Sequence, residues 1–178
     1  MKKEFLVICA VAMLPTVALA ADIPPQEAHL ISIISDSSSR YDSANNDFQK
    51  GAERVKRAKA ICNSLPSRSA KNWVGTVEDL SSTSDGYGVL SIRISDHITV
   101  STNNNKFSDS LGTMKTLVMP DSPVFQKMAS LSKGQTVMFS GVFAPSQNDC
   151  LDELSITQSG SMSDPEFEMK FTDVSPSN

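Results

Sequence analysis

Apolar and small residues between positions 27 and 62 recur at alternating steps of four and three, which is the spacing of one continuous stripe along an α-helix. The members of this stripe are Leu30, Ile34, Ser37, Tyr41, Ala44, Phe48, Gly51, Val55, Ala58 and Cys62. A break near residues 35–39 is an alternative, because three consecutive serines there form a poor helical run. The stripe either packs on the domain that follows or pairs with another chain as a coiled coil. Its small residues favour close packing on its own domain.

From residue 72 onward the period of the apolar pattern becomes two, which is typical of β-strands. We expect main strands at residues 72–78, 89–94, 136–143 and 167–171, with shorter ones at 116–119 and 154–157. Residues 98–102 either extend the strand at 89–94 or form another strand. A short helix precedes the strand at 136–143: Ser122 supplies an N-cap and Pro123 occupies the first turn. Lys133-Gly134 ends this region.

Strand, strand, strand, short helix, strand, strand is the order of an OB-fold, a small Greek-key barrel. The sequence therefore predicts a mainly β protein with some α-helix, in which a five-stranded OB-fold-like barrel (70–175) follows a long N-terminal helix (within 21–65). Gly75, Gly88 and Gly141 suit this prediction, because glycine allows the tight bends of a strongly coiled barrel.

Three stretches carry a resemblance to a known family: Trp73-Val74-Gly75-Thr76-Val77, Ser122-Pro123-Val124-Phe125 and Lys133-Gly134-Gln135-Thr136-Val137-Met138-Phe139-Ser140-Gly141. They look like parts of the periplasmic OB-fold proteins labelled "tRNA anti-like" or nucleic-acid-binding-like. Tyr41 with Ala44, Asn45 and Asn46 resembles the helix that precedes the barrel in those proteins. The resemblance covers residues 40–175 and implies a barrel. The family label records a shape analogy with anticodon-binding domains, so it implies little about the ligand.

Residues 1–20 have the pattern of a secretory signal peptide. Lys2 and Lys3 precede an apolar run at 5–14, and Ala18-Leu19-Ala20 offers a cleavage site. The alternative is a membrane anchor, but the run is shorter than the roughly 20 residues that span a bilayer, and Pro15 interrupts it. We expect export to the periplasm of a Gram-negative bacterium, or secretion.

Cys9 lies within the expected signal peptide, which leaves Cys62 and Cys150 in the mature chain. In an oxidising compartment such a pair is expected to form one disulfide bond. Free thiols and a metal site are the alternatives. Zinc needs three or four ligands, and besides carboxylates only His29 and His97 could supply them. We expect no metal and no cofactor.

The net charge of −4 disfavours a nucleic-acid-binding protein, because such proteins normally carry a basic surplus or stripe. One basic cluster, Arg54, Lys56, Arg57 and Lys59, is interpreted as the solvated face of a helix.

The sequence contains few candidate catalytic side chains. Asp96-His97 is interpreted as a turn, since adjacent residues on a strand point to opposite faces, and His29 is expected to face solvent. Glu166 and Glu168, with Asp152-Glu153, are the carboxylates that could pair for glycoside hydrolysis, but alternation with Phe167 predicts that Glu166 and Glu168 form a solvated face. The sequence therefore predicts a protein that is not an enzyme.

Binding remains the favoured class of function. OB-folds bind ligands on the face of their second and third strands and in the adjoining loops, which here points to Tyr87, Arg93, Lys106 and Phe107. The first hypothesis is a protein partner in the cell envelope. The second is an oligonucleotide or oligosaccharide bound on the barrel face.

Overall fold

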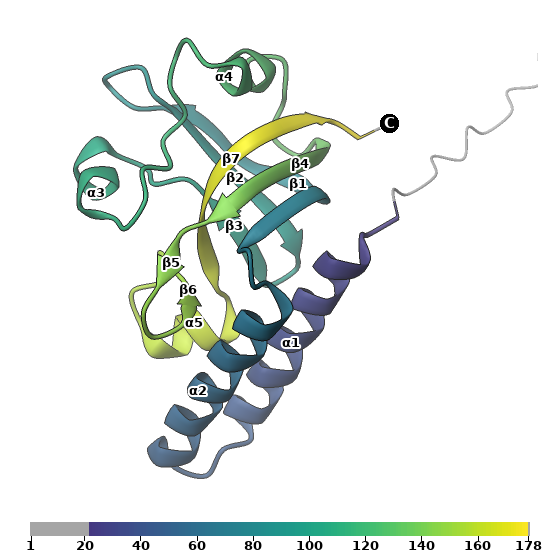
Figure 1. The fold of residues 1–178 in the computed structure, drawn as a ribbon, viewed down its shortest axis with the longest axis vertical. Helices are drawn as coiled ribbons and strands as arrows, with labels where there is room; N and C mark the ends of the chain where they lie inside the picture. Colours follow the sequence, from purple (N-terminus) through teal and green to yellow (C-terminus); the bar gives the residue numbers. More distant parts are fainter. Residues whose placement is uncertain (1–21, 178) are drawn as a thin grey trace, which may run out of the picture.

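The computed structural model describes residues 22–177, so the expected signal peptide at 1–20 lies outside the described residues. A pair of helices, α1 (Pro25–Asp42) and α2 (Asp47–Ser64), precedes the β-structure (Figure 1). The barrel strands are β1 (Ser69–Ser82), β2 (Gly88–Ser95), β3 (Ile98–Ser101), β4 (Thr136–Phe143) and β7 (Glu166–Pro176). The remaining elements are α3 (Lys106–Leu111), α4 (Pro123–Met128), β5 (Pro145–Ser146), β6 (Cys150–Leu151) and α5 (Gln158–Ser163). Among residues 22–177, no helix is long and apolar enough to cross a membrane.

The five barrel strands close in the order β1-β2-β3-β7-β4. Strands β3 and β7 run parallel, and the other neighbouring strands run antiparallel. The last barrel strand, β7, therefore lies between β3 and β4. Helices α3 and α4 belong to the segment that connects β3 to β4. This arrangement confirms the predicted OB-fold-like barrel.

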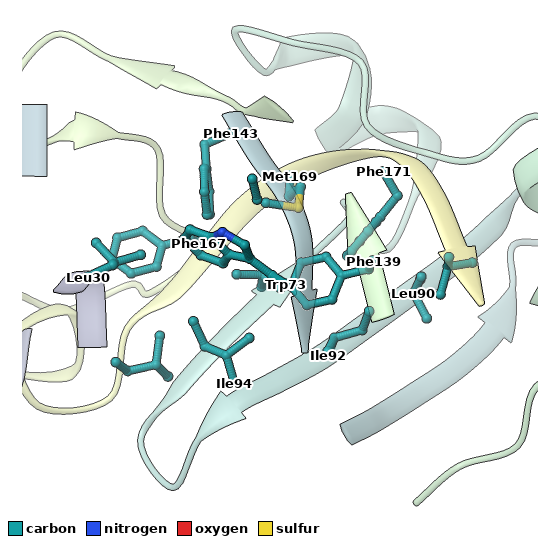
Figure 2. Packing of buried hydrophobic residues seen from close by; sticks show 14 of the residues in the cluster. Leu30, Trp73, Leu90, Ile92, Ile94, Phe139, Phe143, Phe167, Met169 and Phe171 are labelled. Atoms are coloured by element: carbon teal, nitrogen blue, oxygen red, sulfur yellow. The ribbon is translucent and has the colours of Figure 1, made fainter. Parts of the chain in front are cut away.

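The barrel interior is filled by aromatic and branched side chains (Figure 2). Trp73 of β1 is fully buried, and its ring centroid lies 5.6 Å from that of Phe143 and 6.4 Å from that of Phe139. Gly75 of β1 lies against β2, where a Cβ atom would come within 2.7 Å of the Arg93 carbonyl oxygen. The close approach of these two strands requires glycine.

The N-terminal segment is helical as predicted, but it forms a hairpin of two helices and not one continuous helix. The chain turns between Asp42 and Asp47, C-terminal to the break at residues 35–39 that the serine run suggests. Asn46 has an extended backbone, and its side chain accepts a hydrogen bond from the Gln49 N–H at 3.0 Å. This N-cap satisfies a free N–H group of a new helix, so α2 begins there.

The predicted apolar stripe is buried in α1, but in α2 it is buried only at Ala58. Leu30 and Ile34 join the same core cluster as Trp73, which packs α1 on the barrel. In α2 the core contact comes from Ile61, whereas Phe48 and Val55 are 92% and 54% exposed. Because the turn starts the second helix with a new orientation, the seven-residue phase of the first helix does not carry over.

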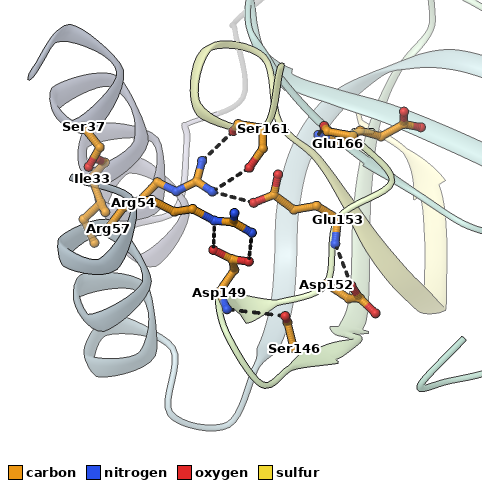
Figure 3. A network of polar contacts seen from close by, with 11 residues as sticks. Ile33, Ser37, Arg54, Arg57, Ser146, Asp149, Asp152, Glu153, Ser161 and Glu166 are labelled. Carbon is orange, nitrogen blue, oxygen red and sulfur yellow. Dashed lines mark hydrogen bonds and ion pairs between the residues drawn. The ribbon is translucent and has the colours of Figure 1, made fainter. Parts of the chain in front are cut away.

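A disulfide bond joins α2 to β6, which confirms the predicted pairing of Cys62 with Cys150. Two arginines of α2 reinforce this connection (Figure 3). Arg54 binds both carboxylate oxygens of Asp149 at 2.6 and 2.5 Å, and Arg57 donates to Glu153 at 2.6 Å. The interpretation of the basic cluster as a solvated face is therefore wrong for these two side chains, which hold the 144–165 connection against the hairpin.

Neither of the two short predicted strands forms. Residues 116–119 contribute an isolated bridge between Val118 and Gly88, and residues 154–157 form no strand. The Thr157 side chain instead accepts a hydrogen bond from Gly160 and caps α5. The predicted helix at Ser122-Pro123 is confirmed, with the Ser122 hydroxyl accepting from the Phe125 N–H.

Candidate functional site

A cleft of about 610 Å³ opens between α3, α4 and β7. Its walls include buried Leu117 and Val118, buried Phe171 of β7, and half-buried Val124 of α4. Met119 also lines the cleft and is 56% exposed. Such a volume falls within the range of pockets that bury a small ligand or a few side chains.

Three lysines line this cleft: Lys106 from α3, Lys115 from the segment that follows α3, and Lys170 from β7. All three are exposed, and among residues 22–177 none of them lies within 4.0 Å of a carboxylate. The Lys106 ammonium lies 5.1 Å from the centroid of the Tyr87 ring, which places a cation over the aromatic face. The cleft thus combines an apolar floor with positive charge.

The two aspartates of the cleft differ in what they bind. Asp109 of α3 is buried, and its Oδ1 accepts hydrogen bonds from the backbone N–H groups of Thr116 and Leu117 at 2.6 and 3.0 Å. Its carboxylate therefore holds the segment after α3 in place. Asp121 is exposed at the cleft and is the acidic group left to offset the lysines.

Glu168 lies beneath this region, and the prediction that it faces solvent is wrong. Its side chain is buried, with Asn103 donating a hydrogen bond to Oε1 and the Thr116 hydroxyl 3.1 Å from the same oxygen. Burial raises the pKa of Glu168 to about 7. Strand alternation missed this position because the chain around Asn103, Gly112 and Thr116 covers the outer side of β7 there.

The structure brings together two of the four predicted binding residues. Tyr87 and Lys106 both line the cleft, and the Lys106 ammonium lies over the Tyr87 ring. Phe107 is 74% exposed on α3, outside the residues that line the cleft. Arg93 lies near the other end of β2, roughly 20 Å from Tyr87 by the rise of a β-strand, where it faces Glu78 at 4.0 Å.

The outer face of β2 and β3 is polar and internally paired. Ser101 donates to Ser91 at 2.9 Å, and Thr99 donates to Glu78 at 3.1 Å. Within the described range, the exposed aromatic side chains are Phe48 and Phe107, and neither belongs to these strands. This face therefore lacks the stacking platform on which single-stranded nucleic acids bind.

Both histidines lie away from the cleft. His29 is exposed on α1, as expected, and His97 lies in the predicted turn between β2 and β3, 3.8 Å from exposed Asp164. In the part of the chain that the structure describes, no group of three or more His, Cys, Asp and Glu side chains could hold a metal ion.

Most of the cleft lies outside the binding residues predicted from the sequence. Lys115, Lys170, Leu117 and Met119 come from segments that meet only in the folded barrel. One signal was available for α3: Asn105 precedes the helix and accepts from the Ser108 N–H at 2.8 Å, as an N-cap residue does.

No protein-family model matches the chain, and neither the curated proteins nor the solved structures contain a match. The resemblance to periplasmic OB-fold proteins therefore stays a prediction. A function for this chain is therefore inferred from the site itself.

Proposed function

We propose that this chain is an exported, non-enzymatic OB-fold-like module that binds a protein partner through the cleft between α3, α4 and β7. The observation that carries the proposal is the combination in one cleft of Leu117, Val118 and Met119 with three exposed lysines that bind no carboxylate in the described chain. Protein interfaces combine an apolar centre with polar groups at the rim.

The neighbouring surface of α3 supports a protein partner. Phe107 and Leu111 lie one helical turn apart and are 74% and 71% exposed. Exposed apolar side chains that gather beside a pocket are typical of interaction surfaces. Exposed aromatic residues in particular are frequent energetic anchors of protein interfaces.

The roles of the acidic groups support binding over catalysis. The Asp109 carboxylate accepts two backbone hydrogen bonds, and Glu168 accepts from Asn103, so each fixes the local chain. A general base must reach the proton it abstracts, and these carboxylates are directed at the protein's own groups.

An oxidising location is part of the proposal. The Cys62–Cys150 disulfide supports it, because disulfides persist in compartments outside the reducing cytosol. The signal-peptide pattern of residues 1–20 points in the same direction. Together they favour the periplasm, with secretion as the alternative.

The proposal is tested by site-specific photo-crosslinking in the cell that makes the protein. Met119 is replaced by p-benzoylphenylalanine, and the same replacement at Ile156, which is 99% exposed and lies outside the cleft, serves as the control. We expect a defined protein adduct from position 119 that is absent from position 156, with its crosslinked peptide identified by mass spectrometry. Irradiation that yields equal adducts at both positions, or none at position 119, would refute a partner in this cleft.

A further inference from the structure

Three side chains of like charge gather at the cleft in a protein whose overall charge is opposite. The chain carries 16 basic and 20 acidic residues, a net charge of −4. Yet the cleft presents Lys106, Lys115 and Lys170 against a single exposed aspartate, Asp121. Since like charges repel and no carboxylate of the described chain neutralises these lysines within 4.0 Å, an acidic group of a partner would find favourable positions here.

The three lysines come from separate parts of the chain, so their positive charges lie at different places around the cleft. Lys106 stands on α3 and is placed over the Tyr87 ring, whereas Lys170 belongs to β7. The hydrogen bonds from Thr116 and Leu117 to Asp109 fix the chain next to Lys115. The positive groups therefore border an apolar floor made of Leu117, Val118 and Phe171.

Such a cleft fits alternating chemistry in its ligand. An extended peptide points successive side chains to opposite sides. An apolar side chain can therefore contact the floor of the cleft, while the acidic side chains on either side of it point back toward the rim, where the exposed lysines lie. We propose that the protein partner presents an acidic segment, with one or more apolar side chains between Asp or Glu residues, to this cleft. This inference rests on the proposed function.

A nucleic acid fits the cleft less well. Bases bind single-strand-binding proteins by stacking on aromatic faces. The one aromatic residue of the floor, Phe171, is only 4% exposed, and the Lys106 ammonium lies over the face of Tyr87. A phosphate backbone would meet the lysines but would leave the apolar floor unfilled.

The test uses fluorescence anisotropy of the purified protein with four labelled peptides. The acidic probe alternates Glu and Leu between Gly-Ser ends; the others replace Glu with Gln, Glu with Lys, or Leu with Ser. We expect the acidic Leu peptide to bind at least tenfold more tightly than each of the others, and its affinity to fall severalfold between 50 and 300 mM salt, because exposed charges are screened. Equal binding of the Gln peptide, or binding of none of the four at 1 mM, would overturn the inference.

A matched pair of variants assigns the effect to the cleft. The triple variant K106Q/K115Q/K170Q should weaken binding of the acidic peptide at least tenfold. The control K59Q/K71Q/K133Q removes three exposed lysines outside the cleft and changes the net charge equally, so it should retain most of the affinity. Equal losses in the two variants would show attraction by net charge alone and would contradict the proposed site. Displacement of the peptide by an equimolar thymidine oligonucleotide would favour a nucleic acid and also overturn it.

The crosslinking experiment separates this inference from the proposed function. An adduct at Met119 whose partner peptide has an excess of Asp and Glu over Lys and Arg supports both. An adduct on a neutral or basic segment would leave the proposed function standing and overturn the acidic partner. If position 119 gives no adduct beyond the Ile156 control, the proposed function itself fails.

Discussion

Arg57 of α2 and Glu153 of the connection between β4 and β7 form a buried ion pair, although 96 residues separate them in the chain. The two side chains are 1% and 9% exposed. Arg57 also donates to the backbone carbonyl and the hydroxyl of Ser161 at 2.6 and 3.0 Å. Burial holds the pKa of Glu153 above its ordinary value even beside the guanidinium. The pair therefore joins the helical hairpin to the connection between β4 and β7 at a buried site.

Replacing Arg57 with Met should destabilise the protein by about 3–5 kcal/mol, because it leaves the Glu153 carboxylate buried without its counter-ion. The double variant R57M/E153L should recover a large part of this loss, since both charges are then absent. Urea unfolding followed by circular dichroism measures the free energies. As a comparison, R54M removes the half-exposed partner of Asp149 and should cost about 1 kcal/mol. A loss for R57M no greater than for R54M would contradict the role of the buried pair.

The buried carboxyl group of Glu27 should make the free energy of unfolding decrease as pH rises from about 4.5 to 7. Its side chain is fully buried in the first turn of α1, where Oε2 accepts from the Val74 N–H at 2.8 Å. Burial raises its pKa from 4.5 to about 7, so in this pH window the folded state binds more protons than the unfolded state. The free energy of unfolding therefore decreases with increasing pH, by about 3 kcal/mol for this group.

The Glu27→Gln variant should lack this contribution. Below pH 4.5 the wild-type carboxyl is protonated in both states, and the difference in stability between the two proteins reflects only the exchange of acid for amide. Above pH 7 the wild type bears the full cost of a buried carboxylate, so the variant should gain stability relative to it. Unfolding curves at pH 4.5, 6 and 8 measure this change, and a constant difference across the three pH values would rule it out.

Two glycines should respond to alanine in opposite directions. In Gly75→Ala the new Cβ would lie 2.5 Å from Ile92 Cγ2 and 2.7 Å from the Arg93 carbonyl oxygen, so β1 and β2 would have to separate. We expect a loss of about 2–3 kcal/mol. Gly51 is helical with nothing within 4 Å of such a Cβ, so G51A should stabilise the protein by up to about 1 kcal/mol. Thermal unfolding distinguishes the two, and a stable G75A variant would refute the close approach of the strands.

Removal of the disulfide should lower stability substantially. The bond links positions 88 residues apart, and the loop-entropy relation gives about 4–5 kcal/mol for a loop of this length. The C62S/C150S variant should therefore unfold at much lower urea concentration than the oxidised protein. Wild-type protein treated with a reductant serves as the matched control and should move to the same midpoint. Identical midpoints for oxidised and reduced protein would contradict this stabilisation.

The barrel could be predicted from the sequence because its strands have strong local signals. Residues 136–143 alternate between inward and outward positions, and β4 occupies that range. The hairpin was missed because the apolar spacing of residues 30–62 continues across the turn, while Asn46 carries the cap that divides the helix. In this segment the Asn46 cap begins a new helix although the periodic apolar pattern continues across the turn.

The candidate site was predictable only in part because it depends on contacts distant in sequence. Tyr87 and Lys106 are predictable as an aromatic residue and a cation in the loops of the expected OB-fold. Lys170 is an exposed residue of β7, and it lines the cleft because the chain between β3 and β4 lies beside that strand. Glu168 was misassigned for the same reason, since Asn103 and Thr116 cover it from another part of the chain.

The place of β7 between β3 and β4 also determines when the barrel can close. Among the five barrel strands, β7 is the last to leave a ribosome or a translocation channel, and until it emerges both β3 and β4 keep an unpaired edge. Exposed strand edges are sites of intermolecular pairing, so the partly emerged chain is open to aggregation. Cys62 and Cys150 both precede β7, and their bond can therefore form before the final strand is present. The disulfide bond would then hold the 144–165 connection against α2 before β7 pairs with β3 and β4 and closes the barrel.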